Sequence, residues 1–109
     1  MVEMINIELK IKLIEIYQEH YSKKNYEETV KEYFKKLGYN VRYNSPVNGN
    51  KGIPDLFIEN NNESFYVECK NNSDGLKINQ IEWILNNPNK IVYIAVPMIH
   101  KNIDYKKWL

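Results

Sequence analysis

The sequence predicts an α/β domain in which helices pack on a mixed β-sheet, in the order α-α-β-β-β-α-β along the chain. Three observations support this prediction. Apolar residues recur at helical spacing over residues 26–37. Two alternating runs, 53–59 and 64–70, are joined by consecutive asparagines, as in a β-hairpin. Residues 90–96 are an almost continuous apolar run, which is typical of a central strand.

The beginning of the chain fits two patterns. Its apolar residues first alternate as in a strand: Ile5, Ile7, Leu9, Ile11 and Leu13. Residues 14–17 then break the alternation, and we interpret residues 4–22 as a helix that is apolar on two faces. Such a helix needs two packing partners, and a second copy of the chain could supply one of them.

The second helix carries clear boundary signals. Asn25 can cap its N-terminus, Glu28 follows at the spacing of a capping box, and Gly38 marks its end. Its inward face is expected to hold Tyr26, Val30, Tyr33, Phe34 and Leu37. A short strand over 39–44 and a loop over 48–52, rich in residues that tolerate positive φ, should follow.

The remaining elements complete one domain, residues 1–109. A helix is expected over 78–87 with Pro88 just past its end, and a short helix near 105–109. The single cysteine excludes a disulfide framework and a cysteine-based zinc site. No run of 18 apolar residues occurs and charges interrupt the N-terminus, so we expect neither a membrane span nor a signal peptide. We therefore expect a soluble protein of the cytoplasm, or of the host-cell cytoplasm if the chain is viral.

The net charge of +1 does not by itself indicate a nucleic-acid partner. Any positive surface must be local, and the candidate patches are Lys35–Lys36, Lys101 and Lys106–Lys107. Such charge runs are also typical of solvated helix faces. His20 and His100 are isolated in the sequence and receive no catalytic role.

The predicted hairpin concentrates acidic side chains. A turn at Asn61 and Asn62 would place Asp55 opposite Glu68, with Lys70 on the same face of the sheet. Directly opposed residues have Cβ atoms about 4.5–5.5 Å apart, where like charges are destabilising unless a cation compensates. Either a divalent cation or the Lys70 ammonium could do so. The alternative is an ordinary solvent-facing strand.

Glu27 is a further acidic candidate. It lies at the edge of the inward face of the second helix, from which it could lean toward the hairpin. Alternatively it is only a carboxylate at a helix N-terminus, where the macrodipole favours negative charge.

Pro54-Asp55 and Glu68-Cys69-Lys70 together resemble the signature of the PD-(D/E)XK nuclease superfamily. Residues 52–56 look like the G-x-P-D-L of its VRR-NUC family, and Asp74-Gly75-Leu76 before a helix with Gln80 and Trp83 is also similar. The resemblance covers residues 26–96. It departs from the family before Gln80, where Lys77 and Ile78 stand in place of the usual serine or threonine.

This resemblance implies a restriction-endonuclease-like core and phosphodiester hydrolysis dependent on Mg²⁺ or Mn²⁺. Asp55 and Glu68 would hold the metal, helped by the Cys69 backbone carbonyl and by Glu27 through water. Lys70 would orient the attacking water or stabilise the transition state. Gln80 would position water or phosphate, unless it is an ordinary surface residue of its helix.

The resemblance further implies a homodimeric endonuclease of DNA repair or recombination, acting on branched DNA such as Holliday junctions. Two sites related by a two-fold axis could nick opposing strands of a symmetric junction. A restriction-type or replication nuclease acting on other DNA, a non-catalytic DNA-binding domain and a small interaction module remain alternatives.

Overall fold

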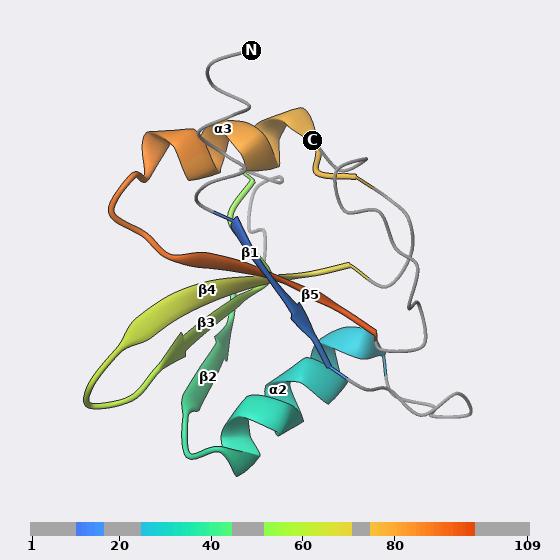
Figure 1. The fold of residues 1–109 in the computed structure, drawn as a ribbon, viewed down its shortest axis with the longest axis vertical. Helices are drawn as coiled ribbons and strands as arrows, with labels where there is room; N and C mark the ends of the chain where they lie inside the picture. The colour runs from blue at the N-terminus through green and yellow to red at the C-terminus, as the bar shows by residue number, and fades with distance from the viewer. Residues whose placement is uncertain (1–10, 17–24, 45–51, 71–74, 98–109) are drawn as a thin grey trace.

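The structure, a computed structural model, describes residues 11–16, 25–44, 52–70 and 75–97 (Figure 1). A five-stranded mixed sheet in the order β1-β5-β4-β3-β2 lies between two helices, with α2 on one face and α3 on the other (Figure 1). The elements are β1 (Ile11–Glu15), α2 (Tyr26–Lys36), β2 (Asn40–Tyr43), β3 (Leu56–Glu59), β4 (Ser64–Cys69), α3 (Ile78–Asn86) and β5 (Val92–Val96). The predicted mixed α/β fold is therefore confirmed.

The predicted helix over 4–22 is wrong where it can be compared, because residues 11–15 form strand β1. β1 pairs in parallel with β5 from Ile11↔Val92 to Glu15↔Val96, and the Ile16 N–H then donates to the Val96 carbonyl at 2.9 Å. The alternating pattern was thus the correct indication. Residues 4–10 and 17–22 lie outside the described residues.

Helix α2 begins and ends close to its predicted bounds. The Asn25 Oδ1 accepts a hydrogen bond from the Glu28 N–H at 2.9 Å, as an N-cap should. Gly38 has φ +93°, which a residue with a side chain rarely adopts, and its N–H donates to the Lys35 carbonyl at 3.0 Å.

The predicted inward face of α2 is too wide. Tyr26, Val30 and Phe34 are buried, whereas Tyr33 is 39% exposed and Leu37 is 57% exposed. Leu37 is the C-cap, past the last helical residue. The Tyr33 ring packs edge-on against Phe34, with ring centroids 5.1 Å apart, instead of entering the core.

The core is divided between the two faces of the sheet. On the α2 face, Val30 and Phe34 pack in one cluster with alternate residues of β3 and β4, among them Ile58 and Val67. On the α3 face, Ile84 packs against Val92 of β5. This division follows from the period of two in a strand, which sends successive side chains to opposite faces.

The predicted hairpin register is confirmed over the four pairs of β3 and β4. Glu59 lies opposite Ser64 and Phe57 opposite Tyr66. The Asn60 Oδ1 fixes the turn by accepting from the backbone N–H groups of Asn62 and Glu63, at 2.8 and 2.9 Å.

The other predicted elements agree with the structure within a few residues. The strand expected over 39–44 is β2, and the helix expected over 78–87 is α3. The apolar run 90–96 contains β5, which lies between β1 and β4 and is therefore central. The helix expected near 105–109 lies outside the described residues. In the part of the chain that the structure describes, no helix has the length and apolar character needed to span a membrane.

Candidate active site

Asp55 occupies the centre of the candidate site. It directly precedes β3, and its backbone carbonyl accepts from the Asn44 N–H at 2.8 Å. The Asn44 Nδ2 donates to the Pro54 carbonyl at 3.1 Å, which ties the same segment to the end of β2. The Asp55 Oδ2 accepts from the Cys69 N–H at 2.8 Å. These bonds direct the Asp55 side chain across the hairpin, toward the end of β4.

Glu68 lies beside Asp55 and is deeply buried, with 4% of its surface exposed. Burial, followed by the hydrogen bond and the negative charge of Asp55, raises the pKa of Glu68 to about 9, and Lys70 opposes this only in part. Burial beside Asp55 therefore favours the protonated form of Glu68. The predicted convergence of Asp55 and Glu68 is present, although the strand ladder itself ends one pair earlier, at Leu56↔Val67.

Glu27 reaches Asp55 from the first turn of α2. Burial raises the pKa of the Glu27 carboxyl, and the charge and hydrogen bond of Asp55 raise it further. The structure thus joins Glu27, Asp55 and Glu68 in a chain of carboxyl groups with Asp55 in the middle.

The residue types around Asp55 are suited to a divalent cation, although their side chains are not arranged as a ready-made metal site. Among the described residues, no three His, Cys, Asp or Glu side chains form a ready-made metal cluster. The donors that do converge on Asp55 are carboxylate oxygens, which hard divalent cations prefer. Burial, and after it the negative charge of Asp55, raises the pKa values of Glu27 and Glu68, so a cation bound among these groups would offset their charge. The donor set therefore fits Mg²⁺ or Mn²⁺.

Gln80 connects Glu68 with Lys70. Its Nε2 donates to the Glu68 Oε2 at 2.6 Å, and its Oε1 accepts from the Lys70 Nζ at 3.2 Å. The same Oε1 also accepts from the backbone N–H of Lys77 at 2.8 Å, as in a capping box at the start of α3. Both ends of the amide are thus engaged by the protein, whereas the sequence prediction gave Gln80 to water or phosphate. The spacing from Lys77 to Gln80 was the signal that could have indicated the capping bond.

Gly52, the first residue of the segment 52–56, has a packing role that the sequence did not reveal. It has φ +79°, and a Cβ there would overlap the backbone carbonyl of Asn79 in α3. The missing side chain therefore lets the first turn of α3, which carries Gln80, approach the segment that carries Asp55. The loop over 48–52 was predicted to need such a residue, but its partner in α3 could not be foreseen.

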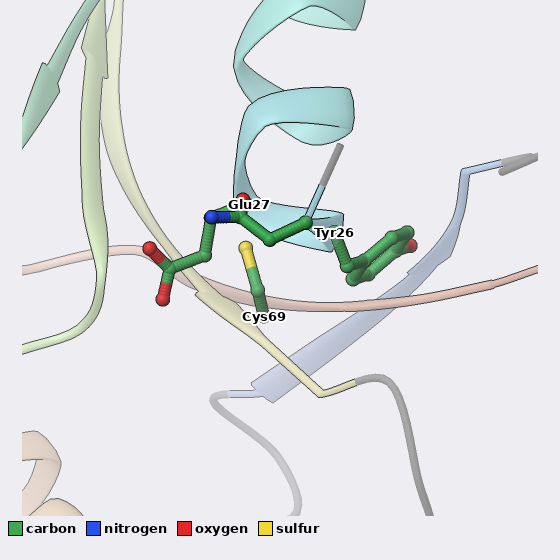
Figure 2. A pocket seen from close by; sticks show the side chains of 4 residues that line it. Tyr26, Glu27 and Cys69 are labelled. Atoms are coloured by element: carbon green, nitrogen blue, oxygen red, sulfur yellow. The ribbon is translucent and has the colours of Figure 1, made fainter. Parts of the chain in front are cut away.

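The thiol of Cys69 lies on the opposite side of β4 from Glu68, beside the first turn of α2 (Figure 2). Cys69 lines a cavity of about 290 Å³ with Asn25, Tyr26 and Glu27. Burial and the neighbouring carboxylates raise the pKa of the thiol far above its ordinary value, so the thiol stays protonated. Cys69 therefore contributes to the site through its backbone N–H and not through its sulfur.

Tyr26 fixes the helix from which Glu27 extends. Its hydroxyl donates to the Ile16 carbonyl at 3.1 Å, just past the end of β1. Figure 2 shows the Tyr26 ring and the Glu27 side chain extending in opposite directions from the start of α2. The N-terminus of α2 is thereby attached to one end of the sheet, and Glu27 is directed toward the hairpin.

No protein-family model, curated protein or solved structure matches this chain. At the site Asp55 lies between Glu27 and Glu68, Gln80 donates to Glu68, and Lys70 donates to Gln80. The site lies where β3 begins and β4 ends, next to the N-termini of both helices.

Proposed function

We propose that this chain is a metal-dependent deoxyribonuclease of the PD-(D/E)XK type, which hydrolyses phosphodiester bonds in DNA. The single observation that carries the proposal is the contact of Asp55 with both Glu27 and Glu68, while Glu68 is joined through Gln80 to Lys70. Paired acids and a nearby ammonium group are the residue types that metal-assisted hydrolysis requires. The resemblance of residues 52–56 and 68–70 to VRR-NUC sequences supports the same function.

In this proposal Asp55 and Glu68 hold Mg²⁺ or Mn²⁺, with the Cys69 carbonyl as a further ligand and Glu27 acting through water. When bound, the metal polarises the scissile phosphate and makes a bound water more acidic. Glu68 must lose its proton to become a ligand, so cation and proton compete for the same group. Lys70 supplies positive charge to the phosphoryl oxygens as negative charge develops on them. Gln80 holds the Lys70 ammonium and the Glu68 carboxyl at a fixed spacing.

Branched DNA, four-way junctions first, is the proposed substrate, and a homodimer is the proposed assembly. Both rest on the family resemblance. The expectation of a dimer from a two-faced N-terminal helix no longer applies, because residues 11–15 form a strand that pairs with β5 of the same chain. A dimer would bring two sites to opposing strands of a symmetric junction.

The proposal is tested with the purified chain and end-labelled DNA. A four-way junction, a flap and a linear duplex of matched sequence are incubated with Mg²⁺, Mn²⁺ or EDTA. We expect cleavage with either cation and none with EDTA. If linear duplex is cleaved at the same rate as the junction, the protein is not junction-selective, and the restriction- or replication-type alternative is favoured.

Lys70→Ala and Glu27→Gln sharpen this test, with Glu28→Gln as a matched control. Lys70→Ala should lower the cleavage rate by about 10²–10³-fold, the usual loss when a group that stabilises transition-state charge is removed. Its unfolding midpoint should stay close to that of the wild type, because Lys70 is half-buried and contacts Gln80 rather than the core. Glu27→Gln should also slow cleavage, whereas the exposed Glu28 should tolerate the same change. Wild-type rates in Lys70→Ala would contradict the assignment.

A further inference from the structure

Four planar side chains lie in series on the α3 face of the sheet, and we call them the aromatic row. The Arg42 guanidinium carbon lies 4.8 Å from the centre of the Phe57 ring. The rings of Phe57 and Tyr66 are 5.0 Å apart, and those of Tyr66 and Trp83 are 4.9 Å apart. The row therefore runs from the edge strand β2 across β3 and β4 to helix α3.

The aromatic row is covered at one end and open at the other. Trp83 packs in the apolar cluster that Ile84 forms with Val92, beneath α3. Phe57 and Tyr66 are half-buried, and Arg42 is exposed at the edge of the sheet. A further planar group can therefore join the row from solvent at the Arg42 end.

The row lies next to the carboxyl groups. Tyr66 and Glu68 are two residues apart on the same side of β4, and Phe57 stands two residues after Asp55. Two residues of a strand span about 7 Å. A ligand with a phosphate at the carboxyl groups would thus place its neighbouring groups over the aromatic row.

We propose that the aromatic row binds unpaired nucleotides adjacent to the phosphodiester that the candidate site cleaves. This proposal rests on the proposed nuclease function. Aromatic rings and guanidinium planes stack on the faces of bases, and they do so with little regard to sequence. In a duplex those faces are covered by neighbouring base pairs, so only unpaired bases can reach the row.

The charges at the two ends of the row match such a ligand. Arg42 stands at the open end and Lys70 at the carboxyl groups, so both can neutralise phosphates of one strand. A nucleic-acid strand is the ligand that combines planar groups with regularly spaced negative charge. Branched DNA with a single-stranded segment, such as a flap, carries such nucleotides, and the row would favour it over uninterrupted duplex.

The same edge strand offers a matched control on its other face. There Lys31 lies over the Tyr43 ring, 5.2 Å from its centre, which is a similar pair of a cation and an aromatic ring. Tyr43 follows Arg42 directly and therefore faces the α2 side, away from the row.

The test is fluorescence anisotropy with the full chain, using labelled oligothymidine and a blunt duplex of equal length. Each row variant, Arg42→Ala or Phe57→Leu, should weaken oligothymidine binding by about 5- to 150-fold. The control variants Lys31→Ala and Tyr43→Leu should bind as the wild type does. Row variants that bind like the controls, or wild type that binds duplex as tightly as oligothymidine, would overturn the proposal. Unfolding midpoints of all four variants, measured in parallel, show that each is folded.

A second readout separates this inference from the proposed function. Mn²⁺ binding, measured by calorimetry, needs the carboxyl groups but no stacked nucleotide. We expect Arg42→Ala and Phe57→Leu to bind Mn²⁺ as the wild type does. A wild-type chain that neither binds Mn²⁺ nor cleaves DNA would overturn the nuclease proposal. Mn²⁺ binding that is intact in all variants, with unchanged oligothymidine binding, would overturn only the row.

Discussion

The two faces of strands β3 and β4 differ in what they bury. On the α2 face Leu56, Ile58 and Val67 have no exposed surface and form a dry apolar layer. On the α3 face of the same strands, Phe57 is only half-buried and Glu68 is a buried acid next to Asp55. Burying an acid costs free energy, whereas burying leucine or valine contributes it. The comparison teaches that the α2 face stabilises the fold, whereas the α3 face holds the ionisable side chains of the candidate site.

Leu56→Ala should give the largest loss of stability. The substitution removes a fully buried side chain on the α2 face and leaves a cavity, so we expect a loss of about 2–5 kcal/mol. Phe57→Ala, the next residue on the other face, should cost less, because its ring is only half-buried; about 0.5–1.5 kcal/mol of its cost comes from the ring contact with Tyr66. Urea unfolding of both variants measures the difference. Equal losses would contradict the contrast between the faces.

Glu68 should make stability depend on pH in the absence of metal. Its pKa is about 9 in the folded chain against 4.5 for a free carboxyl, so the folded state holds more protons than the unfolded state between these values. The free energy of unfolding should therefore fall as the pH rises from about 5 to 9, by at most about 1.4 kcal/mol per pH unit.

Glu68→Gln isolates this effect, because the neutral amide imitates the protonated acid. The variant should lose most of the slope, the remainder coming from Glu27, and it should exceed the wild type in stability at pH 8. Thermal unfolding at several pH values with EDTA is the measurement, and Glu28→Gln serves as the control that keeps the wild-type slope. A slope in Glu68→Gln as steep as that of the wild type would assign the pH dependence to other groups.

Asn25→Ala should have the smallest effect. It removes the side-chain hydrogen bond to the Glu28 N–H at the start of α2 and should cost about 1 kcal/mol. Because Glu27 extends from the same turn, cleavage should fall as well, even under conditions where the chain is fully folded. Unfolding and cleavage assays on the one variant check both expectations. A loss of stability without any change in cleavage would show that the cap does not help to direct Glu27.

Local patterns predicted the hairpin and its acids well. The period of two in residues 53–59 and 64–70, with a turn of asparagines, determines which side chains oppose each other, and Phe57↔Tyr66 follows from it. The pairing of Asp55 with Glu68 is therefore a short-range consequence of sequence. The capping signals at Asn25 and Gly38 are equally local.

Long-range contacts account for what the sequence did not predict. β1 is stabilised by pairing with β5, and the sequence around residues 11–15 gives no sign of that distant partner. The contact of Gly52 with Asn79 likewise depends on how α3 docks on the sheet. The same docking brings Gln80 to Glu68 and Lys70, contacts that the sequence did not predict.

Calorimetric titration with Mg²⁺ and Mn²⁺ tests most directly whether the carboxyl groups around Asp55 bind a cation. The wild type should bind the cation and release protons, so the observed heat should vary with the ionisation enthalpy of the buffer. Asp55→Ala should lose this binding, and Glu28→Gln should retain it. Equal heats for the wild type and Asp55→Ala would contradict the account.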